Sequence, residues 1–158
     1  MSILIADDDA RLRQGLRNLL EEHTGWHVVG EAANGREALE KAVQLVPEVV
    51  ILDISMPELD GIGAARLIRQ ALPQAELLVF TQHDTPEIVA SALDAGVRGY
   101  VLKSQVARDL VPAVEAALQH ASFLSPEISA VHPNLGPEAR NEASASASAG
   151  PPKNRIGN

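Results

Sequence analysis

The sequence has no cysteine, one tryptophan, one tyrosine and two phenylalanines, and it contains no apolar run long enough to cross a bilayer. The absence of cysteine excludes a disulfide framework and a thiolate metal site. The apolar N-terminal stretch, residues 2–6, is too short for a signal peptide or a membrane span. These absences predict a protein of the cytoplasm with no membrane association.

Basic residues are also scarce, because 13 Lys and Arg face 21 Asp and Glu, for a formal net charge of −8. Contacts to nucleic-acid phosphates need clustered Lys and Arg. The composition therefore argues against a stand-alone DNA-binding protein, and any DNA contact would require a further domain.

What the sequence does have is aliphatic residues in two alternating periods. Short runs of β type are followed by amphipathic stretches with apolar residues at i, i+3 and i+4, which is typical of helices. Such β–α repeats predict an α/β fold: a doubly wound, five-stranded parallel sheet in the order 2-1-3-4-5, with five helices. The predicted strands are Ser2–Ala6, His27–Ala32, Glu48–Asp53, Glu76–Thr81 and Arg98–Leu102.

Polar residues follow four of the five predicted strands, at the sheet edge where such folds bind ligands. They are Asp7–Asp9, Asp53, Thr81 and Lys103. Two carboxylates about 4 Å apart repel by roughly 4 kcal/mol near a protein surface. A magnesium ion relieves such repulsion, whereas Asp7–Asp9 in isolation fit a helix cap equally well. The coincidence with Asp53 favours the metal.

A carboxylate beside Mg²⁺ is a plausible nucleophile toward a phosphoryl group, and phosphoryl transfer requires mainly positioning and neutralisation of charge. Lys103 and Thr81 supply a cation and a hydroxyl for this purpose. Each also has a simpler explanation, since lysine often ends a strand in solvent and threonine favours strands.

Three segments and their spacing resemble the CheY-like receiver domain of two-component response regulators, which has the flavodoxin-like fold. The sequence around the last predicted strand is most similar to the NarL/FixJ (LuxR-type) subfamily of transcription regulators. The resemblance covers residues 1–121, which we predict to form the receiver domain. Its segments are "ILIADDDARLRQGLRNLL", "VVILDISMPELDGIGAARLIR" and "LLVFTQHDTPEIVASALDAGVRGYVLKS", followed by "FLSPEIS".

The resemblance implies that Asp53 accepts a phosphoryl group from a sensor histidine kinase. It also implies that Mg²⁺ is bound by Asp7, Asp8, Asp53 and the backbone carbonyl of Ser55. The protein would then catalyse only its own phosphorylation and dephosphorylation, and would not be an enzyme for another substrate. It would form a homodimer when phosphorylated.

The resemblance further assigns Lys103 and Thr81 to the phosphoryl oxygens. Tyr100 would rotate inward as Thr81 moves, which would remodel the face built from the fourth helix, fifth strand and fifth helix. We also predict that Ser55, Gln82 and His83, which flank the site in sequence, set the lifetime of the phosphoryl group.

The C-terminal part is predicted as a short linker helix over residues 122–131 and a disordered tail over residues 132–158, with no output domain. Two hypotheses stay open: a regulator whose LuxR-type DNA-binding output is missing from this chain, or a stand-alone receiver that acts on partner proteins or as a phosphate shuttle. A third, a Mg²⁺-dependent phosphatase of the haloacid-dehalogenase type, is disfavoured because residues 7–11 lack the final Thr or Val of D-x-D-x-[TV].

Overall fold

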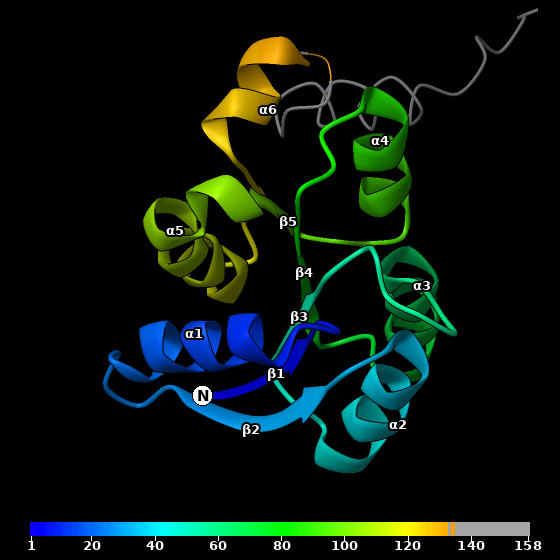
Figure 1. The fold of residues 1–158 in the computed structure, drawn as a ribbon, viewed down its shortest axis with the longest axis vertical. Coiled ribbons are helices and arrows are strands. Elements are labelled where there is room, and N and C mark those ends of the chain that lie inside the picture. Colours follow the sequence, from blue (N-terminus) through cyan, green and yellow to red (C-terminus); the bar gives the residue numbers. More distant parts are fainter. Residues whose placement is uncertain (133, 135–158) are drawn as a thin grey trace, which may run out of the picture.

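The computed structural model describes residues 1–132 and 134, and it places a single parallel sheet at the centre of the fold (Figure 1). The strand order is β2-β1-β3-β4-β5-β6. Four of the strands, β1, β3, β4 and β5, are almost completely buried, as expected for a parallel sheet covered on both faces. The strands are β1 (Ser2–Ala6), β2 (His27–Ala32), β3 (Val49–Leu52), β4 (Glu76–Thr81), β5 (Gly99–Leu102) and β6 (Phe123–Leu124).

Helices cover both faces of this sheet (Figure 1). On one side α1 and α5 bury leucine and valine against β1, β3 and β4; on the other, α2, α3 and α4 pack through alanines and short aliphatic side chains. Alanine lets those three helices approach the strands closely. The helices are α1 (Ala10–Glu21), α2 (Gly35–Leu45), α3 (Gly61–Ala71), α4 (Pro86–Asp94), α5 (Val106–Leu118) and α6 (Pro126–Val131), with a 3₁₀ turn at Lys103–Gln105.

The predicted α/β class, the five predicted strands and their order are confirmed, and the described residues contain one strand more than predicted. The sixth helix, α6, lies within residues 122–131, where a short linker helix was predicted. A sixth strand, β6, pairs in parallel with β5. The Phe123 amide donates to the Arg98 carbonyl at 3.1 Å and the Ser125 amide to the Tyr100 carbonyl at 2.9 Å. Two residues are too short for a periodic signal, so the sequence did not distinguish this strand from a linker.

A buried serine fixes β6 and α6 to the rest of the domain. The Ser125 hydroxyl donates to Asp109 Oδ2 at 2.8 Å and accepts from the Leu102 amide at 3.0 Å. Both Ser125 and Asp109 are almost fully buried, and Arg108 holds the other oxygen of Asp109 at 2.6 Å. The segment after α5 is therefore part of the packed domain as far as Val131.

We expect Ser125→Ala to lower the free energy of unfolding by about 2 kcal/mol, because it leaves the buried Leu102 amide without the Ser125 acceptor and removes one of the two donors to Asp109 Oδ2. Urea unfolding followed by circular dichroism measures this change. Ser129→Ala, in the helix that follows Ser125 and only partly buried, is the matched control and should stay within about 0.5 kcal/mol of the wild type. Equal stability of both variants would contradict the role of Ser125.

The predicted disordered tail lies outside the described residues, except for His132 and Asn134. Within the described part of the chain, every helix falls short of the length and hydropathy that crossing a membrane would require.

Candidate functional site

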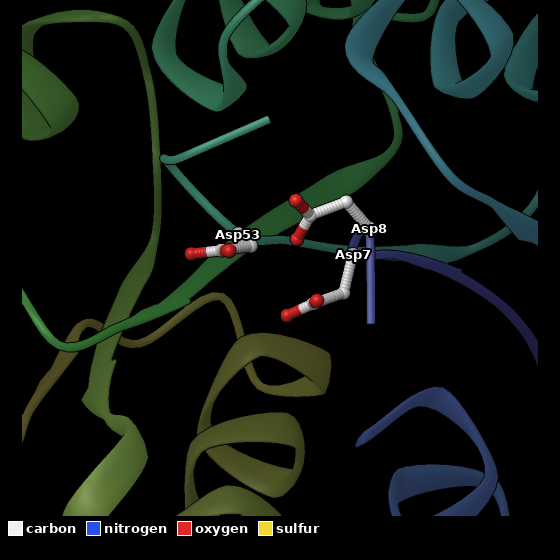
Figure 2. Close-up of side chains that lie close together, drawn as sticks. All are labelled: Asp7, Asp8 and Asp53. Carbon is white, nitrogen blue, oxygen red and sulfur yellow. The ribbon is translucent and has the colours of Figure 1, made fainter. Parts of the chain in front are cut away.

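Two buried strands carry the acids of the site to the same edge of the sheet. Asp7 follows β1 and Asp53 follows β3, and the Asp53 amide donates to the Ala6 carbonyl at 2.9 Å, which places the two residues side by side. Asp7 is 0% exposed and Asp53 2%. Figure 2 shows their carboxylates together with that of Asp8. The apolar strands thus hold the two acids out of solvent at fixed positions.

The three acids after β1, Asp7–Asp9, have two different structural roles. Asp9 caps α1, because its Oδ1 accepts from the Arg11 amide at 2.8 Å and from the Leu12 amide at 3.4 Å. Asp7 and Asp8 instead join Asp53. The cap interpretation is therefore confirmed for Asp9, whereas Asp7 and Asp8 belong to a cluster that could hold a metal ion.

Three carboxylates fit a divalent cation at this position. One oxygen from each of Asp7, Asp8 and Asp53 lies within 4.8 Å of the others. The Oδ2 atom of Asp7 is buried and accepts no hydrogen bond of good geometry among the described residues, although the Lys103 ammonium lies 2.9 Å from it. Hard oxygen donors of this kind, with room for water on the exposed side of Asp8, suit Mg²⁺.

Lys103, which follows β5, supplies the positive charge. Its Nζ atom lies 2.9 Å from Asp7 Oδ2 and 3.0 Å from Asp53 Oδ2, and also 4.9 Å from the centre of the Phe80 ring. Burial disfavours the ammonium, but the close contacts and the charges of the two acids outweigh it and raise the pKa of Lys103. Lys103 is therefore charged and shared between the acids.

Burial is also the main cause that raises the pKa of Asp53, and the charge of Asp7 adds to it against the opposing effect of Lys103. A carboxylate whose ionisation is disfavoured by its surroundings is poised to gain from a cation or from conversion to an ester-like acyl phosphate. The position of Asp53 thus favours chemistry at its oxygen.

The turn after Asp53 allows α3 to begin close to the site. A side chain on Gly61 would clash with the carbonyl oxygen of Asp53, so only glycine permits this approach. Asp60 caps α3 by accepting from the Gly63 amide at 2.7 Å. These residues shape the loop, and Ser55 lies within it.

Thr81 and Tyr100 meet at the β4–α4 loop. Thr81 is fully buried, and its Oγ1 atom accepts from the His83 amide at 3.3 Å. Tyr100 is also 0% exposed, and its hydroxyl donates to the His83 carbonyl at 2.7 Å. Burial, with the charges of nearby acids, raises the pKa of Tyr100, so the phenol stays protonated. The ring already occupies the inward position that the sequence analysis assigned to the switched state.

Of the three residues predicted to set the phosphoryl lifetime, the structure brings two together. Ser55 Oγ and His83 Nε2 lie 2.6 Å apart and connect the loops after β3 and β4. Gln82 is exposed, and its side chain makes no hydrogen bond within the described residues.

Sequence reasoning missed Arg13. Its Nη1 atom donates to the Asp7 carbonyl at 2.6 Å. The helix α1 carries three arginines, at positions 11, 13 and 17, and no pattern in the sequence separates the one that reaches the acidic loop.

Comparison with known proteins gives consistent matches to this sequence and fold. The response regulator receiver domain family matches residues 3–115. The response regulator protein VraR of Staphylococcus aureus (strain Mu3) is 36% identical over 128 residues, which are 81% of this chain and 61% of VraR. The chain thus spans about three fifths of the length of this curated relative.

Two solved structures are similar over most of the chain. A two-component response regulator of the LuxR family from Aurantimonas sp. is 35% identical with a TM-score of 0.77, covering 93% of this chain and 98% of that one. The isolated receiver domain of RcsB from Salmonella enterica serovar Typhimurium, solved with the phosphomimetic BeF₃⁻, is 31% identical with a TM-score of 0.76, covering 82% and 96%. The chain therefore belongs to the response regulator receiver domain family, and its relatives are LuxR-type regulators.

Proposed function

We propose that this chain is a phospho-acceptor switch: Asp53 receives a phosphoryl group from a sensor histidine kinase, in the presence of Mg²⁺. The observation that carries this proposal is the position of Asp53. It ends a buried strand 3.0 Å from the Lys103 ammonium, and its ligand atom lies within 4.8 Å of those of Asp7 and Asp8.

In the proposed transfer, an oxygen of Asp53 attacks the phosphorus of a phosphohistidine, the P–N bond breaks and the kinase imidazole leaves with that electron pair. Asp7, Asp8, Asp53 and the Ser55 carbonyl would hold Mg²⁺, which supplies neutralisation of the charge that builds on the phosphoryl oxygens. Lys103 reaches the site from the end of β5 and would pair with a phosphoryl oxygen. The three carboxylates and the lysine are thus all used in one step.

The signal leaves the site through the β4–α4 loop. Thr81 exchanges its contact with the His83 amide for a phosphoryl oxygen, which changes the loop whose carbonyl holds the Tyr100 hydroxyl. The face formed by α4, β5 and α5 changes with it. We propose that this change promotes homodimerisation and controls a LuxR-type DNA-binding output, in the cytoplasm. A stand-alone receiver that acts on partner proteins would use the same face.

Incubation with acetyl phosphate tests this function. With Mg²⁺ the intact mass should rise by one phosphoryl group per chain, and peptide mapping should place that group on Asp53; excess EDTA should prevent it. A group on another residue, or uptake that ignores EDTA, would overturn the proposal. Release of many equivalents of phosphate from a phosphomonoester would indicate the phosphatase alternative instead.

We expect Ser55→Ala to shorten the lifetime of the phosphoryl group about fivefold. The hydrogen bond between Ser55 and His83 joins two loops beside Asp53 and restricts the approach of water, and its loss is worth about 1 kcal/mol. Intact mass measured over time after removal of acetyl phosphate gives the rate. Gln82→Ala, at an exposed position, should change the lifetime less. An unchanged lifetime in Ser55→Ala would show that the bridge does not limit hydrolysis.

A further inference from the structure

Arg13 connects the acidic loop to the neighbouring strand β2. From α1, its Nη1 atom donates to the backbone carbonyl of Asp7 at 2.6 Å, and its Nε atom to Glu31 Oε1 at 3.1 Å. The side chain is only 17% exposed. One guanidinium therefore bridges a carbonyl of the metal-binding loop and a carboxylate of the sheet.

The orientation of the Asp8 carboxylate depends on its backbone, because its side chain has no contact that would fix it among the described residues. Asp7 is held by its own side-chain contacts, since Oδ1 accepts from the Asp9 amide at 2.7 Å and Oδ2 faces Lys103. Asp8 is exposed, and no hydrogen bond or ion pair of its side chain is found among the described residues. Whatever fixes its backbone therefore fixes where its carboxylate can reach.

The bond from Arg13 acts at that point of the backbone. The Asp7 carbonyl and the Asp8 nitrogen belong to one planar peptide unit. A donor held against the Asp7 carbonyl consequently orients the plane from which the Asp8 side chain projects. The other end of Asp7 is fixed as well, because its amide donates to the Ala32 carbonyl at 3.0 Å.

Glu31 gives Arg13 a firm anchor. Arg17, one turn further along α1, donates to Glu31 Oε2 at 2.8 Å, and the Lys41 ammonium contacts the Glu31 carbonyl. Partial burial opposes ionisation of Glu31, but the hydrogen bonds and charges of Arg17 and Arg13 outweigh it and lower the pKa of Glu31. The anchor stays charged at neutral pH.

We propose that Arg13 is a positioning residue for the divalent cation: it orients the Asp7–Asp8 peptide so that Asp8 meets the ion together with Asp7 and Asp53. This inference rests on the proposed metal site and names a further residue that determines its affinity. The sign of the effect separates it from simple electrostatics. A positive charge near the site repels Mg²⁺, so removal of charge alone would tighten binding, whereas loss of positioning weakens it.

The test is calorimetric titration of the unphosphorylated full chain with MgCl₂ at fixed pH and ionic strength. We expect Arg13→Ala to bind Mg²⁺ roughly tenfold more weakly, the lower end of the effect of losing an outer partner of a metal ligand. Arg17→Ala is the matched control: it removes the same charge from the same helix and the same partner Glu31, but does not touch the Asp7 carbonyl. It should bind Mg²⁺ as tightly as the wild type or more tightly.

Thermal unfolding without Mg²⁺ separates positioning of the metal ligands from a merely structural role of Arg13. A merely structural role would lower the melting temperatures of Arg13→Ala and Arg17→Ala, and the two variants would then have the same Mg²⁺ affinity. If Arg13→Ala does not fold, Arg13→Lys replaces it; that variant should bind more weakly than the wild type, because one ammonium cannot reach both partners. Wild-type or tighter affinity in the Arg13 variant, or equal weakening in Arg17→Ala, would overturn the inference alone. A wild-type chain that binds no Mg²⁺ would overturn it together with the proposed metal site.

Discussion

Asp53→Asn is expected to take up no phosphoryl group from acetyl phosphate, while the wild type takes up one. The amide has no anionic oxygen to attack phosphorus, whereas Asp7, which also lies against Lys103, and Asp8 are unchanged in this variant. Intact-mass measurement gives the result directly. Asp60→Asn, in the same loop, is the matched control, since Asn caps α3 as well as Asp does.

The control should be phosphorylated like the wild type. Equal phosphorylation of Asp53→Asn would instead mean that Asp7 or Asp8 carries the group, and the assignment of the acceptor would be wrong.

The same substitution should make the protein more stable at neutral pH in the absence of Mg²⁺. Burial raises the pKa of Asp53 above its ordinary 3.8, so the folded state holds that proton more tightly than the unfolded chain. The stability that this bound proton contributes is fully present below pH 3.8 and is lost as the pH rises through the raised pKa of Asp53. Asn is neutral at every pH. The melting temperature of Asp53→Asn should therefore equal that of the wild type in acid and exceed it above the raised pKa of Asp53, by about 3 °C for each kcal/mol of stability that the wild type loses.

Lys103→Met should have the largest effect on folding, with a loss of about 3 kcal/mol at neutral pH without Mg²⁺. Lys103 contacts both Asp7 and Asp53, which are almost fully buried, and its removal leaves their negative charges unopposed. Urea unfolding measures the loss. Lys41→Met, which removes a more exposed lysine paired with Glu37, should cost less than about 1 kcal/mol.

Two further measurements define the cause of this loss. Saturating Mg²⁺ should restore part of the stability, because the ion replaces the missing charge and binds only the folded state. The double variant Asp53→Asn, Lys103→Met should lose about 1–2 kcal/mol less than the sum of the single variants, since the two residues are in contact. If Lys103→Met were as stable as the wild type at neutral pH, the acids would not depend on the lysine for neutralisation.

The sequence predicted the parts of the molecule that repeat. Alternating β and helical periods predicted the α/β class, and the strand order came from the commonest topology of that class. Polar residues at the ends of apolar strands predicted that Asp7, Asp8, Asp53 and Lys103 lie together, as they do in the structure. Periodicity carries no signal for a strand as short as Phe123–Leu124, so β6 was missed.

Contacts between separate loops also could not be predicted from the sequence. The distance from Ser55 to His83 and the reach of Arg13 to the Asp7 carbonyl depend on how loops and helices pack, not on spacing along the chain. The inward position of Tyr100 is likewise a property of packing, because either orientation suits an amphipathic ring on a strand.

The short pairing of β6 with β5 has a consequence for how the switch can be observed. The Ser125 amide is bonded to the carbonyl of Tyr100 itself, within a ladder of only two residue pairs. An edge pairing can open locally without unfolding of the central strands, and its amides then exchange with solvent in that open state. The hydrogen-exchange rate of the Ser125 amide is therefore an intrinsic reporter of the backbone at Tyr100, and it can be followed in the unmodified chain without an added probe.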